Sequence, residues 1–179
     1  MRIVGGRAGG RRLAVPPTGT RPTSDRVREA LFSALEARDV LVDARVLDLC
    51  AGSGALGLEA LSRGASTAVL VERDPRACAV ITTNARTVGV GGALVRRAAA
   101  ATYLRRTPDP VDLVFLDPPY ADSVDDVLGL LGPWLADRAM VVVERDVRSP
   151  APTWPSGLEP EAVRTYGETV VHLAVRTSA

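Results

Sequence analysis

Apolar residues in this chain fall into short runs, separated by stretches with a helical repeat. Continuous or alternating apolar runs, typical of strands, are found at 45–49, 67–72, 93–97, 111–116 and 139–144. Apolar residues at the spacing of one helix face are found at 55–64, 75–88 and 124–135. Strands that alternate with helices predict a parallel sheet with right-handed crossovers and helices on both faces.

The two ends of the chain depart from this alternation. Two strand-like runs, 158–166 and 169–176, are joined closely at a glycine and predict a terminal antiparallel hairpin. Residues 2–15 predict a second hairpin around a glycine-rich turn. The predicted fold is therefore α/β and Rossmann-like. It has a mostly parallel seven-stranded sheet, helices on both faces, a C-terminal antiparallel hairpin and an N-terminal β-hairpin arm.

We expect two units along the chain. Residues 1–20 are the basic arm with its linker, and residues 21–179 are the main domain. The main domain should begin with a helix whose N-cap is Thr23 or Ser24, because apolar residues then follow at helical spacing.

The composition excludes several kinds of chemistry. The chain has 179 residues, 46% of them hydrophobic and 24% charged, as in an ordinary globular domain. All 22 basic residues are arginine, which excludes a Walker P-loop and lysine-based covalent catalysis. His172 is the one histidine and lies in an apolar run, so no metal site is expected. Two cysteines and the lack of a long apolar run predict a cytoplasmic protein that does not contact membranes. We also expect a monomer.

The charge is unevenly distributed along the chain. Residues 1–30 contain seven arginines and two acids, although the whole chain has a net charge of only +1. A basic segment on a mildly acidic body favours an anionic partner, most simply nucleic acid, and a solvated tail is the alternative. The arginines expected to bind RNA are Arg2, Arg7, Arg11, Arg12, Arg21, Arg26 and Arg28.

A glycine-rich turn follows the first strand of the main domain and opens a helix. Gly52, Gly54 and Gly57 match the GxGxxG spacing, in which small residues let a cofactor approach the backbone. Glu72 ends the next strand, where an acid accepts hydrogen bonds from ribose hydroxyls. NAD and S-adenosylmethionine both contain adenosine, but Asp48 favours the latter because it can bind a cationic amino-acid group or fix the loop. The expected cofactor-binding residues are Asp48, Ala51, Gly52, Ser53, Gly54, Glu72 and Arg73.

A second motif, Asp117-Pro118-Pro119-Tyr120, follows the apolar run 111–116. It therefore lies at the carboxyl end of the sheet, where such folds bind ligands. The prolines hold the backbone extended, so the Asp117 side chain and the Pro118 carbonyl can accept both hydrogens of one exocyclic amine. Tyr120 offers a face on which a purine can stack. These four residues are the candidate catalytic residues.

Together the two motifs resemble the class I S-adenosylmethionine-dependent methyltransferases that act on exocyclic amines. The segments 21–32 and 46–65 further resemble one family, the bacterial 16S ribosomal RNA guanine-N2 methyltransferases (the RsmD family), over nearly the whole chain. The resemblance implies methylation of a guanine N2 in 16S ribosomal RNA, within the small ribosomal subunit or its assembly intermediate, with S-adenosylhomocysteine as the product. One departure is that no acid follows the third strand, so no side-chain ligand for the cofactor adenine is carried over.

Three alternatives stay open from the residues alone. An adenine-N6 methyltransferase acting on DNA or RNA would use the Asp-Pro-Pro-Tyr motif equally well. An NAD-dependent oxidoreductase fits the glycine spacing, but this motif and the lack of an acid–base histidine oppose it. A non-catalytic ribosome-assembly factor would only bind RNA.

Overall fold

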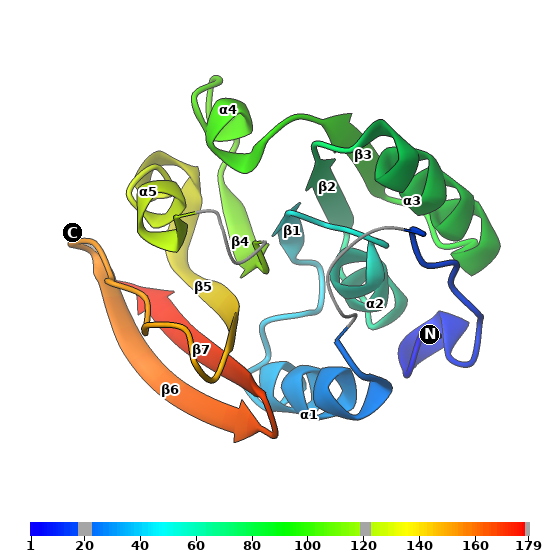
Figure 1. Ribbon diagram of the computed structural model, residues 1–179, viewed down its shortest axis with the longest axis horizontal. Coiled ribbons are helices and arrows are strands. Elements are labelled where there is room, and N and C mark those ends of the chain that lie inside the picture. The colour runs from blue at the N-terminus through cyan, green and yellow to red at the C-terminus, as the bar shows by residue number, and fades with distance from the viewer. Residues whose placement is uncertain (18–22, 119–122, 178–179) are drawn as a thin grey trace.

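The protein is built around one seven-stranded sheet with the order β3-β2-β1-β4-β5-β7-β6, as the computed structural model shows for residues 1–17, 23–118 and 123–177 (Figure 1). Strands β1 to β5 pair in parallel, whereas β7 is antiparallel to both β5 and β6. This order confirms the predicted sheet and its terminal hairpin. The strands are β1 (Arg45–Leu49), β2 (Thr67–Glu72), β3 (Ala93–Arg97), β4 (Val111–Leu116), β5 (Leu135–Asp146), β6 (Leu158–Tyr166) and β7 (Thr169–Arg176).

Helices cover both faces of the sheet. Figure 1 shows α1, α2 and α3 on one face and α4 and α5 on the other. Each face has its own cluster of buried apolar side chains. None of the helices in the described ranges is long and apolar enough to cross a membrane. The helices are α1 (Asp25–Glu36), α2 (Ala55–Ser62), α3 (Pro75–Val88), α4 (Ala100–Leu104) and α5 (Val124–Leu128), with short 3-10 turns η1 (Gly6–Ala8) and η2 (Gly132–Trp134).

The helix boundaries follow local capping chemistry where the sequence provides it. The Ser24 hydroxyl accepts a hydrogen bond from the Val27 amide, so the N-cap of α1 is the second of the two residues expected. Asp74 caps α3 in the same way, and Gly89 ends that helix with a φ of 68°. These ends could be predicted because the cap residue and its partner are neighbours in the chain.

The prediction for residues 124–135 was wrong. Helix α5 ends at Leu128, η2 follows, and β5 already begins at Leu135. The segment contains Gly129, Gly132 and Pro133, and the proline cannot donate the backbone hydrogen bond that would continue a helix.

Helix α4 was not predicted at all, because its five residues are too few to show a helical repeat. Tertiary contacts stabilise it instead. The Tyr103 ring packs on Trp134 with centroids 5.2 Å apart, and the indole N–H of Trp134 donates to the Leu104 carbonyl at 2.9 Å.

The N-terminal segment pairs as a hairpin only at one bridge, between Arg2 and Arg12. Its apolar side chains Ile3, Ala8 and Leu13 are buried in the same core cluster as α1 and α2. The segment is therefore docked on the sheet domain and lies beside α2 and α3 (Figure 1). The division of the chain after residue 20 stays a prediction, because residues 18–22 lie outside the described ranges.

The docking is polar as well as apolar. The backbone amides of Val4 and Gly5 each donate to the buried Glu59 carboxylate at 2.8 Å, and the Ala8 amide donates to the Ser62 hydroxyl at 2.9 Å. Helix α2 thus satisfies backbone groups that a free arm would expose to water.

Candidate active site

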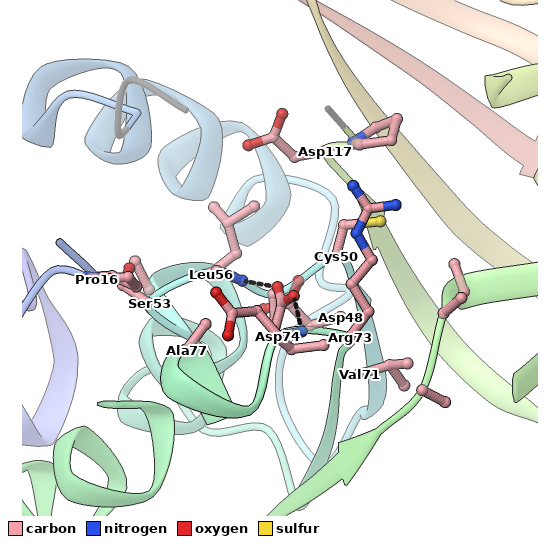
Figure 2. Close-up of a pocket in the computed structure, with 18 of the residues that line it drawn as sticks. Pro16, Asp48, Cys50, Ser53, Leu56, Val71, Arg73, Asp74, Ala77 and Asp117 are labelled. Atoms are coloured by element: carbon pink, nitrogen blue, oxygen red, sulfur yellow. Dashed lines mark hydrogen bonds between the residues drawn. The ribbon is translucent and has the colours of Figure 1, made fainter. Parts of the chain in front are cut away.

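A cavity of about 800 Å³ opens at the carboxyl ends of β1, β2 and β4 (Figure 2). Its walls come from the turn between β1 and α2, from the end of β2, from Ala98–Ala101 and from Asp117 and Pro118. Figure 2 shows Asp117 across the pocket from Asp74 and Ala77. The structure therefore brings the two predicted motifs together around one space, as expected for motifs at the same edge of a parallel sheet.

The glycine turn depends on backbone conformations that other residues rarely adopt. Gly52 and Gly54 have φ of 58° and 78°. A Cβ on Gly54 would lie only 3.0 Å from Ile81 and 3.1 Å from Leu70, whereas a Cβ on Gly52 would have nothing closer than 4.0 Å. Gly54 is thus required by packing, and Gly52 lines the cavity and leaves its backbone open to a ligand.

Glu72 ties the glycine turn to the end of β2. Its carboxylate accepts hydrogen bonds from the backbone amides of Gly52 and Asp74, both at 2.9 Å, which are the dashed lines in Figure 2. The two bonds hold the turn open and leave further oxygen lone pairs available to a hydroxyl group.

Asp48 is buried beneath the same turn and accepts a hydrogen bond from the Gly57 amide at 2.9 Å. Burial raises its pKa from 3.8 to about 7, with the Gly57 amide opposing and the Glu72 charge adding to the rise. Of the two roles expected for this acid, the geometry shows that it fixes the loop. The same residue also lines the cavity.

Asp117 lies at the opposite wall, directly after β4. Among the residues that the structure describes, no group donates a hydrogen bond to its carboxylate. Burial raises the pKa of Asp117 well above its usual value, and the charges of Glu144 and Asp48 raise it further against the opposing effect of Arg145. Pro118 lines the cavity beside it. Pro119 and Tyr120, the other two candidate catalytic residues, lie outside the described residues.

Glu144, near the carboxyl end of β5, is a site residue that sequence reasoning missed. Its two carboxylate oxygens both lie 2.8 Å from the Thr23 hydroxyl, which lines the cavity. Burial raises the pKa of Glu144, while the Thr23 hydrogen bond and the Arg28 charge lower it. The available signal was an acid directly after an apolar strand, but only the strand order reveals that this strand neighbours β4.

The arginines expected to bind RNA are in different environments. Arg28 has a fully buried side chain, so the expectation that it contacts RNA does not fit the structure. Its guanidinium bonds the Thr23 carbonyl at 3.0 Å, Asp25 at 2.8 Å and the Arg2 carbonyl. Because this arginine ties the start of α1 to the N-terminal segment, its role is structural.

The other expected RNA contacts are exposed or lie outside the described ranges. Arg12 and Arg26 are exposed, and Arg2 is exposed beside Asp25. Arg7 and Arg11 are also exposed, although each donates to a backbone carbonyl of the sheet domain. Arg21 is one of the residues that are not described.

The wall that would face an adenine is made of alanines. Ala98, Ala99, Ala100 and Ala101 line the cavity after β3, and they carry no side-chain hydrogen-bonding group. Within the described residues there is no group of three or more His, Cys, Asp or Glu that could hold a metal ion.

Comparison with known protein families gives a match over nearly the whole chain. The family described as Conserved hypothetical protein 95 matches residues 1–175. The chain is 41% identical to the Ribosomal RNA small subunit methyltransferase D of Escherichia coli K12, over 98% of this chain and 90% of that protein. It is 34% identical to the protein of the same name from Haemophilus influenzae, over 84% of this chain and 81% of that protein.

The fold matches a solved structure equally well. The structure of the Escherichia coli protein yhhF superposes with a TM-score of 0.88 at 41% identity, covering 100% of this chain and 99% of that one. The similarity extends over the N-terminal segment, the sheet and the terminal hairpin together.

Proposed function

The chain belongs to the family described as Conserved hypothetical protein 95, and from this premise we propose that it methylates the N2 of a guanine in 16S ribosomal RNA. Its family and fold are those of a methyltransferase. The observation that carries the proposal is the position of Asp117, which lies across one cavity from the glycine turn (Figure 2). Pro118 lines the same cavity.

The cavity fits S-adenosylmethionine, which supplies an electrophilic methyl group when bound. The exposed backbone at Gly52 and the alanine wall leave room for the adenosine. Glu72 would accept hydrogen bonds from the ribose hydroxyls, and Asp48 would face the methionine ammonium group. The residues that would complete the cofactor site are Ala51, Ser53, Gly54 and Arg73.

Asp117 and Pro118 would act on the nucleophile. A guanine amine is a weak nucleophile because its lone pair is delocalised into the ring. Hydrogen bonds from its two hydrogens to the Asp117 carboxylate and the Pro118 carbonyl would favour the pyramidal nitrogen that frees this lone pair. Holding the nitrogen in line with the methyl group would supply much of the remaining acceleration. Pro119 and Tyr120 follow in the same sequence motif, and we propose that Tyr120 stacks on the base.

The amine must also lose one proton as the new N–C bond forms. In the proposed geometry that proton leaves along the hydrogen bond to the Asp117 carboxylate, from which it passes to water. Neither a metal nor a covalent enzyme intermediate is needed.

Ribosomal RNA would contact arginines on both sides of the cavity. On one side are the exposed arginines of the N-terminal region, namely Arg2, Arg7, Arg11, Arg12 and Arg26. On the other side, residues 93–108 contain four arginines and no acid. Of these, Arg97 ends β3, and the guanidinium of Arg106 lies over the Tyr103 ring, 5.4 Å from its centroid. Such contacts to phosphates supply most of the affinity in protein–RNA binding.

We further propose that the substrate is the 16S RNA within the small subunit or its assembly intermediate, and that the protein acts as a cytoplasmic monomer. The target guanine has to be unstacked to reach the cavity, as for other enzymes that modify bases.

Identification of the methylated nucleoside tests the proposal. Small subunits from a strain that lacks this methylation are incubated with the protein and labelled S-adenosylmethionine, and the RNA is digested to nucleosides. We expect the label in N2-methylguanosine. Label in N6-methyladenosine, or no transfer despite cofactor binding, would overturn the guanine assignment or the enzymatic role, respectively.

A further inference from the structure

Glu144 is a half-buried acid that the proposed mechanism does not use. Buried carboxylates in proteins are usually paired with a cation or with several donors. Among the described residues, the Thr23 hydroxyl is the group that donates to Glu144, and no cation lies within ion-pair distance of it. A carboxylate has four lone-pair sites, so most of its capacity to accept hydrogen bonds is left over.

This spare capacity lies next to Asp117. Leu116 of β4 pairs in register with Val143 of β5, so Asp117 and Glu144 are the next residues along two neighbouring parallel strands. Neighbouring strands are about 4.8 Å apart, and residues at the same level point to the same face. The charge of Glu144 also contributes to the raised pKa of Asp117, which requires that the two groups be close.

The N-terminal end of α1 holds Glu144 in place. The Thr23 hydroxyl bonds both of its oxygens, and the buried Arg28 guanidinium bonds the Thr23 carbonyl at 3.0 Å. Thr23 and Asp117 both line the cavity. Glu144 adjoins both of these lining residues, Thr23 through its hydrogen bond and Asp117 through the strand register, so the two acids form a pair of acceptors at the edge of the cavity.

Guanine and adenine differ in what they would present to such a pair. Guanine carries N–H donors at N1 and N2, which are both bonded to C2. Adenine carries an N–H donor at N6 and an acceptor at N1, which are both bonded to C6. Two neighbouring carboxyl acceptors match the first arrangement and oppose the second.

We infer that Glu144 accepts the N1–H of the target guanine while Asp117 accepts an N2–H, so that Glu144 selects guanine over adenine. The inference rests on the proposed function, and it supplies the discrimination that the Asp-Pro-Pro-Tyr motif lacks. Because burial raises the pKa of both acids, the N–H donors of guanine would also stabilise their ionised forms.

A substrate analogue separates this role from a structural one. 2-Aminopurine keeps the reacting N2 amine but has an acceptor at N1 in place of the N–H donor. Small subunits are reconstituted with 16S RNA that carries either guanine or 2-aminopurine at the methylated position. Single-turnover rates are then measured for the parent protein and for Glu144→Gln. The side-chain amide of glutamine can accept the N1–H of guanine and can also donate to the bare N1 of 2-aminopurine. The variant should therefore methylate both bases.

We expect the ratio of the guanine rate to the 2-aminopurine rate to fall by roughly tenfold or more in Glu144→Gln, as for the loss of one base-specific contact. Glu159→Gln is the matched control, because Glu159 is an exposed acid on β6, and its ratio should equal that of the parent. A parallel fall of both rates, or an unchanged ratio, would show that Glu144 only holds the fold and would overturn the inference. Failure of the parent to methylate guanine at all would instead overturn the proposed function.

Discussion

The acids on the two sides of the cavity differ in their hydrogen-bond partners. On the cofactor side, Glu72 and Asp48 accept hydrogen bonds from the backbone of the glycine turn. On the base side, Glu144 receives one hydroxyl donor, and no described residue donates to Asp117. The acids of the cofactor side thus accept backbone hydrogen bonds within the fold, whereas the acids of the base side keep most of their acceptor capacity unused by the described residues.

This difference indicates how the two sides respond to substitution. Loss of an acid on the cofactor side removes bonds that shape the protein, so binding and stability should change together. Loss of Asp117 on the base side removes acceptors that no described residue uses, so turnover should change while the fold persists.

The largest effect is expected at Asp117. Asp117→Ala removes one acceptor of the target amine and leaves the glycine turn intact. Turnover at saturating cofactor should fall by roughly 10²–10³, as for loss of one hydrogen bond to a transition state. Affinity for S-adenosylmethionine, measured by calorimetry, should stay near that of the parent. Asp117→Asn keeps an acceptor oxygen and should retain more activity than alanine, and an alanine variant with the parent rate would remove Asp117 from the site.

A smaller effect, of a different kind, is expected at Glu72. Glu72→Ala removes the acceptor of the Gly52 and Asp74 amides. Affinity for S-adenosylmethionine should fall by roughly 10–100-fold, since hydrogen bonds to a charged group contribute about 1.5–3 kcal/mol. The melting temperature without ligand should fall too. Glu72→Gln keeps one acceptor oxygen. Its affinity and melting temperature should therefore lie between those of the parent and of Glu72→Ala. If the affinity fell while the melting temperature did not, the two sides of the cavity would not differ in the way described.

Asp48 gives a test of stability against pH. Its pKa is raised to about 7 in the folded protein, from 3.8 as the ordinary value, so the folded state binds more protons than the unfolded state between those values. The free energy of unfolding should therefore lose a contribution as pH rises from about 4 to 7. Asp48→Asn cannot ionise, so its free energy of unfolding should decrease less over this range. At pH 8 its melting temperature should be higher than that of the parent, by roughly 2–4 °C for each kcal/mol of unfolding free energy that is retained. Parallel melting curves for the two proteins across this range would contradict the assignment.

The smallest effects are expected from substitution of two arginines at a time on either of the two basic surfaces. Arg2→Ala with Arg12→Ala tests the N-terminal surface, and Arg97→Ala with Arg106→Ala tests the surface after β3. The slope of the logarithm of the RNA-binding constant against the logarithm of salt concentration should become shallower by roughly 0.7–0.9 for each phosphate contact that is lost. Arg38→Ala is the control, because Arg38 pairs with Glu161 near the other edge of the sheet. An unchanged slope in either double variant would remove that surface from the RNA interface.

Gly54→Val, in contrast, is a poor test of the cofactor side. From the sequence, the expectation is that this variant keeps its fold and weakens cofactor binding. The structure shows a φ of 78° and neighbouring side chains about 3 Å from an added Cβ, so stability should fall as well. Gly52→Ala changes the cavity with less crowding.

Local patterns in the sequence were enough to predict much of this protein. The apolar runs located the strands, Thr23 or Ser24 marked the start of the first helix, and the glycine turn and Asp117-Pro118 marked two walls of one cavity. Each of these features depends on residues that are close in the chain, or on the rule that parallel strands present their carboxyl ends at one edge.

Only the tertiary structure decided which distant residues meet. The strand order places β5 beside β4, so Glu144 lies next to Asp117, and no periodicity records that adjacency. Arg28 looked like one more basic residue of a positively charged segment, but the docking of the N-terminal segment buries it. The physical reason is the same in both cases. Burial and pairing between remote segments depend on how whole elements pack, whereas a sequence pattern reports only the preferences of neighbouring residues.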